Sequence, residues 1–198
     1  AQTLLGDVSR EGENDVRHRY SSVQGTAEFS MNGTFSVRFQ PGAWAKEHER
    51  SYEDASQSCL ERIDFQGTLI SSESGERPGQ TVLTYYQNWE GTPLFSCQVT
   101  LLWQDDTLLR MEGQRLSGTI TSSSEEETLS AATVLVRFLA GVTEGGFVCS
   151  RIDEMNAGYL IVSGTTRRVE LTPVWRITTD SGAYYVDAIT GELSPTED

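Results

Sequence analysis

The sequence has little histidine, lysine, cysteine and proline, and it lacks a long apolar run. Its 198 residues include 2 histidines, 3 cysteines and 5 prolines, and Lys46 is the single lysine. Without about 18 consecutive apolar residues, no segment is expected to span a bilayer. Three widely spaced cysteines and two histidines predict neither a disulfide scaffold nor a metal site.

Basic charge is also scarce. The chain carries 15 Lys and Arg against 29 Asp and Glu, which gives a formal net charge of −14. Binding to phosphate backbones or to anionic lipid needs a basic surface, so both functions are disfavoured. A hydrophobic content of 37% is nevertheless typical of a folded globular chain. Its length suits one domain or two small lobes.

The residue patterns of common catalytic sites are missing. His18 and His48 both lie in polar segments, and no nucleophile elbow, phosphate-binding loop, zinc-protease or calcium-loop spacing occurs. The acidic clusters fit a turn, a helix start and a tail, namely Asp105-Asp106, residues 125–127 and Glu197-Asp198. We therefore expect no enzyme, no catalytic residue, no cofactor and no metal, while a hydrolase with an unrecognised site stays open as an alternative.

The cysteines and the start of the chain each allow two interpretations. Cys59, Cys97 and Cys149 lie among apolar residues, which favours buried thiols over one disulfide with a free thiol. The sequence starts at Ala1 without an initiator methionine or a visible signal peptide. We expect that an upstream segment, either a signal peptide or an anchoring helix, has been removed.

The first half of the chain predicts a hairpin, a helix and a meander. Strands over residues 23–30 and 34–40 meet at Asn32-Gly33, a dipeptide suited to tight turns. Ser51 is typical of a helix N-cap, and the apolar stripe that follows places Cys59 in the core. Residues 81–89, 93–103 and 108–116 read as antiparallel strands, with loops over residues 12–20, alternatively a frayed helix, and 71–80.

The second half predicts another helix followed by strands. Hydroxyl and acidic residues between Thr121 and Glu127 favour a helix start over a linker. The wide apolar face that follows, which includes Val136 and Leu139, indicates deep burial. Strands are expected over residues 147–152, 159–162, 169–179 and 183–189, with a loose tail after Leu193.

An apparent internal repeat sets the predicted fold class. Residues 91–95 read Gly-Thr-Pro-Leu-Phe and residues 171–175 read Leu-Thr-Pro-Val-Trp, each ahead of a strand and an Asp turn. We therefore predict an α+β fold of two similar lobes, each an antiparallel sheet packed against a helix. Residues 1–120 form the lobe with the hairpin, helix and meander, and residues 121–198 form the C-terminal lobe.

The segment from Leu171 to Glu192 resembles a known module. Its sequence, LTPVWRITTDSGAYYVDAITGE, is similar to the end of a PepSY-type module, and the whole chain resembles the extracytoplasmic part of YycH/YycI-type regulators. This resemblance implies a PepSY-like or YycI-like fold. It also implies a Gram-positive protein on one N-terminal membrane helix that restrains the sensor histidine kinase of a two-component system. The single lysine and the strong acidity depart from the group's pattern.

The resemblance implies a functional hypothesis. The chain would be a non-enzymatic extracytoplasmic regulatory module, anchored to the cell membrane by a helix outside this sequence, whose partner is an envelope protein such as a sensor histidine kinase. The alternative is a PepSY-type inhibitor or chaperone of a peptidase or a germination hydrolase. Candidate partner contacts are Trp44 in a loop and Tyr184 and Tyr185 on opposite faces of a strand, where ordinary sheet packing is the alternative.

Overall fold

The computed structural model describes residues 1–14, 17–118, 127–162 and 169–195. Within them lie three helices and twelve strands. The helices are α1 (Gln2–Leu5), α2 (Tyr52–Glu61) and α3 (Ala131–Glu144). The strands are β1 (Ser9–Asn14), β2 (Arg17–Ser22), β3 (Gly25–Ser30), β4 (Thr34–Phe39), β5 (Gly67–Ser74), β6 (Gln80–Trp89), β7 (Thr92–Gln104), β8 (Thr107–Gln114), β9 (Ile152–Val162), β10 (Glu170–Thr179), β11 (Gly182–Asp187) and β12 (Leu193–Pro195).

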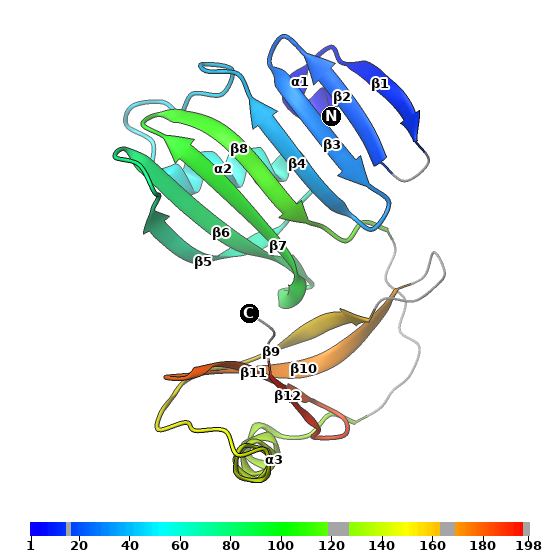
Figure 1. The fold of residues 1–198 in the computed structure, drawn as a ribbon, viewed down its shortest axis with the longest axis vertical. Coiled ribbons are helices and arrows are strands. Elements are labelled where there is room, and N and C mark those ends of the chain that lie inside the picture. Colours follow the sequence, from blue (N-terminus) through cyan, green and yellow to red (C-terminus); the bar gives the residue numbers. More distant parts are fainter. Residues whose placement is uncertain (15–16, 119–126, 163–168, 196–198) are drawn as a thin grey trace. The chain divides into compact units, whose positions relative to one another are not determined.

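All twelve strands belong to one hydrogen-bonded sheet. Its main order is β1-β2-β3-β4-β8-β7-β9-β10-β11-β12, while β6 pairs with β7 and carries β5 (Figure 1). Neighbours pair in antiparallel fashion, except that β7 meets β9 in parallel where Leu94 lies opposite Tyr159. The sheet is therefore mixed.

This topology corrects the predicted fold class. Two similar lobes, each with its own antiparallel sheet against a helix, are not what the chain forms, because a single sheet of 12 strands runs through it. The physical cause is the 13-residue length of β7. Its later residues pair with β8 from Val99 onward, and its beginning pairs with β9, so one strand joins both sets of strands. The Thr-Pro pairs also differ in place, since Pro93 is near the start of β7 and Pro173 is inside β10.

Two compact units can be described separately. Unit 1 comprises residues 1–91 and 96–118, and unit 2 comprises residues 92–95 and 119–198. The predicted lobe boundary between residues 120 and 121 lies outside the described residues, so it stays a prediction.

Helix α2 closes the core of unit 1. Ser51 is its N-cap and accepts a hydrogen bond from the amide of Asp54 at 3.0 Å, as the sequence predicts. Its buried side turns Cys59 and Leu60 toward the sheet. The strictly alternating residues of β7 are all buried, namely Phe95, Cys97, Val99, Leu101 and Trp103, and the last three of them supply the opposite wall of this core. The alternation of apolar and polar residues therefore correctly predicted which side chains of this strand are buried.

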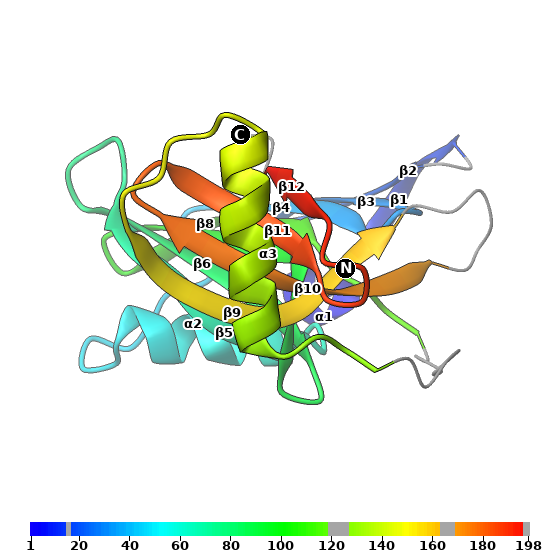
Figure 2. The same cartoon turned by 90° about the horizontal axis from the view of Figure 1, so that it is seen from below.

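Helix α3 covers the strands of unit 2. Val134, Phe138 and Val142 face a core that includes Ile177 and Tyr184. Figure 2 shows the helix lying across these strands. It begins after the N-cap Ser130, and residues 127–130 are not helical, so the predicted start between Thr121 and Glu127 is wrong for the part described. Residues 121–126 lie outside the described residues.

Hairpins were predicted well and irregular segments poorly. The hairpin at Asn32-Gly33 is confirmed, as are the turns at Glu90-Gly91, Asp105-Asp106 and Asp180-Ser181. The predicted loop over residues 12–20 holds parts of β1 and β2, and the loop over residues 71–80 holds the end of β5. Conversely, residues 147–151 precede β9 and form no strand. Polar strands at a sheet's margin lack the apolar alternation that would reveal them.

Candidate functional site

The chemistry-bearing side chains do not gather into a catalytic or metal centre in the part of the chain that the structure describes. There, no group of three or more His, Cys, Asp or Glu residues could hold a metal ion. His48 Nδ1 lies 3.5 Å from Asp106 Oδ2, but its side chain is 96% exposed. Lys46 Nζ, at 2.9 Å, is the closer partner of that carboxylate and lowers its pKa. Asp106 thus anchors a surface turn.

The three cysteines are free thiols, and two of them are deeply buried. Burial raises the pKa of Cys59 to about 12 and that of Cys97 to about 11. A thiol with so high a pKa is protonated near neutral pH and is therefore a poor nucleophile. Cys149 is half-buried, and its Sγ lies 3.7 Å from the carbonyl oxygen of Arg151.

Trp44, the first predicted partner contact, is a half-buried anchor of unit 1. Its indole Nε1 donates a hydrogen bond to the carbonyl oxygen of Leu4 at 3.1 Å, which ties α1 to the loop after β4. Its ring lies 5.9 Å from that of Phe39 and packs against the core. The guanidinium of Arg62 lies 4.8 Å from the ring centroid on another side. Three contacts hold this side chain, so much of it serves packing.

Tyr184 and Tyr185 point to opposite faces of β11, as alternation requires. Tyr184 is buried, with its ring 5.5 Å from Phe138 and 5.7 Å from Phe147. Tyr185 is half-buried, and its ring lies 5.7 Å from Phe95 on the other face. Trp44 belongs to unit 1, and the two tyrosines belong to unit 2.

An exposed apolar stripe lies on the outer side of α3. Val136 is 67% exposed and Leu139 is 50% exposed, whereas Val134, Phe138 and Val142 of the same helix are buried. Beyond the helix, Phe147 is 40% exposed and Val148 is 80% exposed. We call these four residues the α3 face. Within unit 2, no other described element lies over the outward side of the helix in Figure 2.

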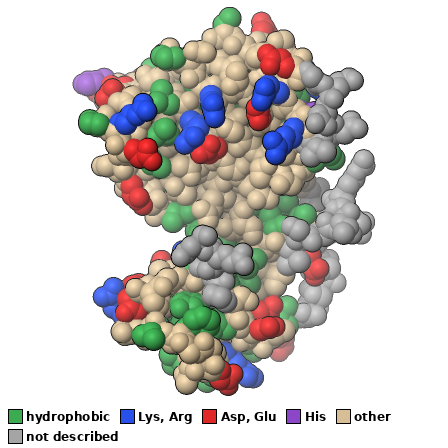
Figure 3. Space-filling model, in the orientation of Figure 1, with side chains coloured by type: hydrophobic (Ala, Val, Ile, Leu, Met, Phe, Trp, Pro, Cys, Tyr) green, Lys and Arg blue, Asp and Glu red, His purple; other side chains and the backbone are tan. Residues whose placement is uncertain are grey.

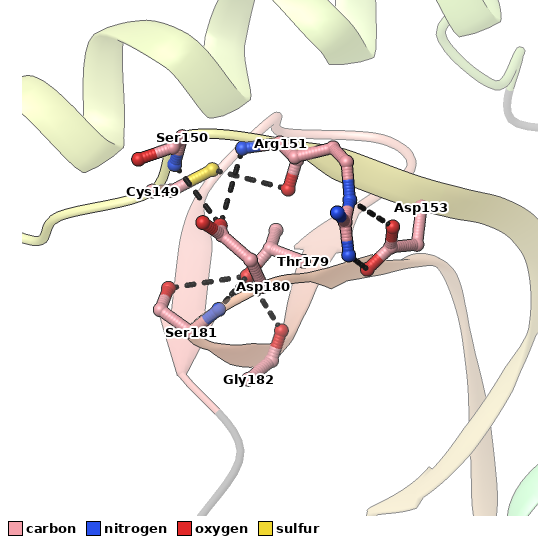
Figure 4. A network of polar contacts seen from close by, with 8 residues as sticks. All are labelled: Cys149, Ser150, Arg151, Asp153, Thr179, Asp180, Ser181 and Gly182. Carbon is pink, nitrogen blue, oxygen red and sulfur yellow. Dashed lines mark hydrogen bonds and ion pairs between the residues drawn. The ribbon is translucent and has the colours of Figure 1, made fainter.

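A network of hydrogen bonds holds the loop that completes the α3 face. The Asp180 carboxylate accepts bonds from the backbone amides of Ser150 at 3.0 Å and Arg151 at 3.1 Å, and these bonds lower its pKa (Figure 4). Arg151 pairs in turn with Asp153 at 2.6 Å. Thr179 closes the same turn by donating to the Gly182 carbonyl. The β10–β11 turn thereby fastens the segment that carries Phe147 and Val148.

The solvent-facing side of the sheet in unit 1 is charged but balanced. Basic and acidic side chains both lie on this face (Figure 3), and ion pairs join Arg19 to Glu28 and Arg110 to Glu112. Exposed ion pairs of this kind each contribute at most about 1 kcal/mol. This side resembles an ordinary solvated sheet surface more than a docking site.

The sequence missed the α3 face although its signal was present. The helix is apolar on more of its circumference than one packing interface can cover, and we interpreted this excess as deep burial. A helix on one side of a sheet buries a single stripe, here Val134, Phe138 and Val142. The remaining apolar residues must then face outward.

Comparison with known proteins supports the fold and leaves function open. No family model matches the sequence, and no curated protein matches it. A crystallised, uncharacterised protein from Eubacterium rectale is similar with a TM-score of 0.67 and 12% identity, covering 96% of this chain and 76% of that one. The C-terminal domain of Bacillus megaterium YpeB has a TM-score of 0.47 and 12% identity, covering 97% of this chain and 89% of that one. At that score it establishes neither a shared fold nor a shared function.

The described helices also bear on membrane insertion. None of those helices is long and apolar enough to cross a bilayer.

Proposed function

We propose that this chain is a non-enzymatic binding module that regulates another protein of the cell envelope by contact. The PepSY-like string from Leu171 to Glu192 supports the proposal at the level of sequence. In the structure this string forms β10, a two-residue turn and β11, the strands that carry α3. By the same resemblance, the module works outside the cytoplasm and is held at the membrane by an N-terminal helix.

The α3 face is the observation that carries this proposal. Two branched apolar side chains one helical turn apart are exposed, and two more apolar residues in the loop after the helix are exposed as well. Contiguous exposed apolar groups are typical of protein contact sites, because water around them is released on binding. The Asp180 network orders the loop beforehand, which lowers the entropy lost on association.

The proposed partner is the extracytoplasmic domain of a sensor histidine kinase. The YycH/YycI resemblance suggests this class of partner. The net charge of this chain indicates which kind of partner surface it would bind. A chain with a net charge of −14 associates fastest with a partner whose contact surface is apolar at its centre and basic at its rim. Such a contact would bias the kinase between its two signalling states.

The test replaces the α3 face without disturbing the core. The double variant Val136→Gln and Leu139→Gln is measured by biolayer interferometry against the purified extracytoplasmic domains of the sensor histidine kinases of the same organism. We expect binding by the native chain and at least a tenfold loss in the variant, since exposed interface residues of this kind are worth about 1–2 kcal/mol each. Because both side chains are exposed, the free energy of unfolding should change by less than about 0.5 kcal/mol.

A matched control uses exposed apolar residues of unit 1. Val23→Gln with Met31→Gln removes side chains that are 93% and 69% exposed and makes the same chemical change elsewhere. This control should bind like the native chain. Equal losses in both variants, or binding to a neighbouring peptidase or germination hydrolase instead of the kinase, would contradict the proposal.

A further inference from the structure

A cavity in unit 1 shares no residue with the α3 face of unit 2 and has no role in the function proposed above. It is an open cavity of about 260 Å³ between α1, the end of α2 and the β3–β4 hairpin. Its walls combine apolar side chains from these elements with two arginines: Leu4, Phe29, Phe35, Ile63, Arg62 and Arg115. Ligand sites typically combine a mostly apolar hollow with a few polar groups in this way.

The apolar part of the cavity is built from stacked rings. Phe29 and Phe35 lie opposite each other on β3 and β4, with ring centroids 6.1 Å apart and planes inclined by 22°. Leu4 of α1 is 2% exposed, and Phe35 is 6% exposed. These side chains are fixed by the core, so the hollow keeps its shape without a ligand.

The polar part of the cavity is cationic. The guanidinium of Arg62 lies over the Trp44 ring, and Arg115 donates a hydrogen bond to the backbone carbonyl of Ile63. Both contacts orient the guanidinium groups and leave further N–H donors. Across the described residues, neither arginine has a carboxylate within ion-pair distance. In a chain with 29 acidic residues, two such arginines in one cavity are unexpected.

Asp64 limits the charge that a ligand can carry. It belongs to the same wall as the two guanidinium groups and as Ala1, whose amino group has a pKa lowered by burial and by the charge of Arg115. The excess of positive charge there favours an anionic group, whereas the Asp64 carboxylate makes the cavity less favourable for a phosphate dianion than for a monoanion. The volume suits a ligand of about a dozen non-hydrogen atoms, at the low end of small-molecule sites.

We propose that this cavity binds a small monocarboxylate with an aromatic or branched apolar tail. The carboxylate accepts hydrogen bonds from Arg62 and Arg115, and the tail lies against Phe29, Phe35 and Leu4. Charge-assisted bonds from planar guanidinium groups set the orientation. The apolar hollow supplies the affinity that distinguishes this ligand from acetate.

Hydrocinnamate is the probe, and hydrocinnamyl alcohol is its neutral analogue. Calorimetry should detect binding of the acid, with the alcohol at least tenfold weaker because the alcohol lacks the charge that the arginines contact. Amide chemical shifts should move at Phe29, Phe35 and Ile63, which locates the ligand. Arg62→Gln and Arg115→Gln should each weaken hydrocinnamate about tenfold and leave the alcohol unchanged.

Arg38→Gln is the matched control. It removes the same charge, but Arg38 is exposed and points to the opposite face of β4 from Phe35 and the cavity. It should leave the affinity within twofold of native. If Arg115→Gln fails to fold, Arg62→Gln decides alone, since Arg62 is exposed and follows the last residue of α2.

Three results would overturn the proposal. They are equal affinities for the acid and the alcohol, an equal loss in Arg38→Gln and Arg62→Gln, and no binding of hydrocinnamate at millimolar concentration. The cavity and the α3 face belong to different units, so the kinase-binding experiment can fail or succeed without changing this outcome.

Discussion

Asp180 shows how one exposed carboxylate can order a whole loop. Its side chain accepts two backbone hydrogen bonds across 30 residues of sequence, from Ser150 and from its neighbour Arg151. Backbone amides aimed at a carboxylate stabilise its charged form, which is why its pKa lies below the ordinary value. The loop depends on this ionised acceptor.

Asp180→Ala should release the loop after α3. We expect the amide protons of Ser150 and Arg151 to exchange with solvent markedly faster, as measured by hydrogen–deuterium exchange. Asp153→Ala is the control, because Asp153 contacts only the side chain of Arg151 in this network. Unchanged exchange in Asp180→Ala would show that the loop is held by other contacts, such as that of Phe147 with Tyr184.

At the scale of elements, the β3–β4 turn depends on a distant strand end. Gly33 has a φ of +87°, and a Cβ placed on it would lie 2.2 Å from the carbonyl oxygen of Arg115 after β8. Gly42 has a similar φ of +81° but open space around it. Alanine substitutions at the two glycines therefore allow the cost of backbone strain to be distinguished from the cost of a steric clash.

Gly33→Ala should cost much more stability than Gly42→Ala. The left-handed conformation alone costs about 1–2 kcal/mol in both variants. The clash with Arg115 should bring the loss at Gly33 to about 3 kcal/mol or more. Urea unfolding measures both values, and equal losses would mean that the β3–β4 turn moves away from Arg115 at little cost.

Elements also show where sequence patterns were informative. Period-two alternation predicted the buried residues of β7, and Ser51 predicted the start of α2, because both signals arise within a few neighbouring residues. The outward side of α3 was not predictable in this way. Whether an apolar residue such as Val136 is buried depends on how many partners the helix has, and those partners are distant in sequence.

At the scale of the whole molecule, buried acids make stability depend on pH. Burial raises the pKa of Cys59 from 9.0 to about 12, of Cys97 from 9.0 to about 11, and of Tyr85 from 10.0 to about 12. Above pH 9 the unfolded thiols lose protons while the folded ones keep them. The free energy of unfolding must therefore fall as pH rises from about 9 toward 11.

The slope of this fall should be at most about 1.4 kcal/mol per pH unit for each buried thiol. Urea unfolding at pH 7, 9 and 10.5 under reducing conditions measures it. Cys59→Ala with Cys97→Ala should flatten the decline, whatever stability the variant has at pH 7. A slope in the double variant that is as steep as in the native chain would contradict the assignment to the buried pair.

The sequence by itself determined what neighbouring residues decide: acidic charge, the positions of most hairpins, the cap of α2 and the inward face of β7. The joining of β7 to β9, the single sheet, the unpartnered face of α3 and the pairing of Arg62 with Arg115 at one cavity were decided only by the tertiary structure. Each of these brings together residues far apart in the chain. Local propensity and periodicity do not reveal such contacts, because the contacts stabilise the chain only once it has folded.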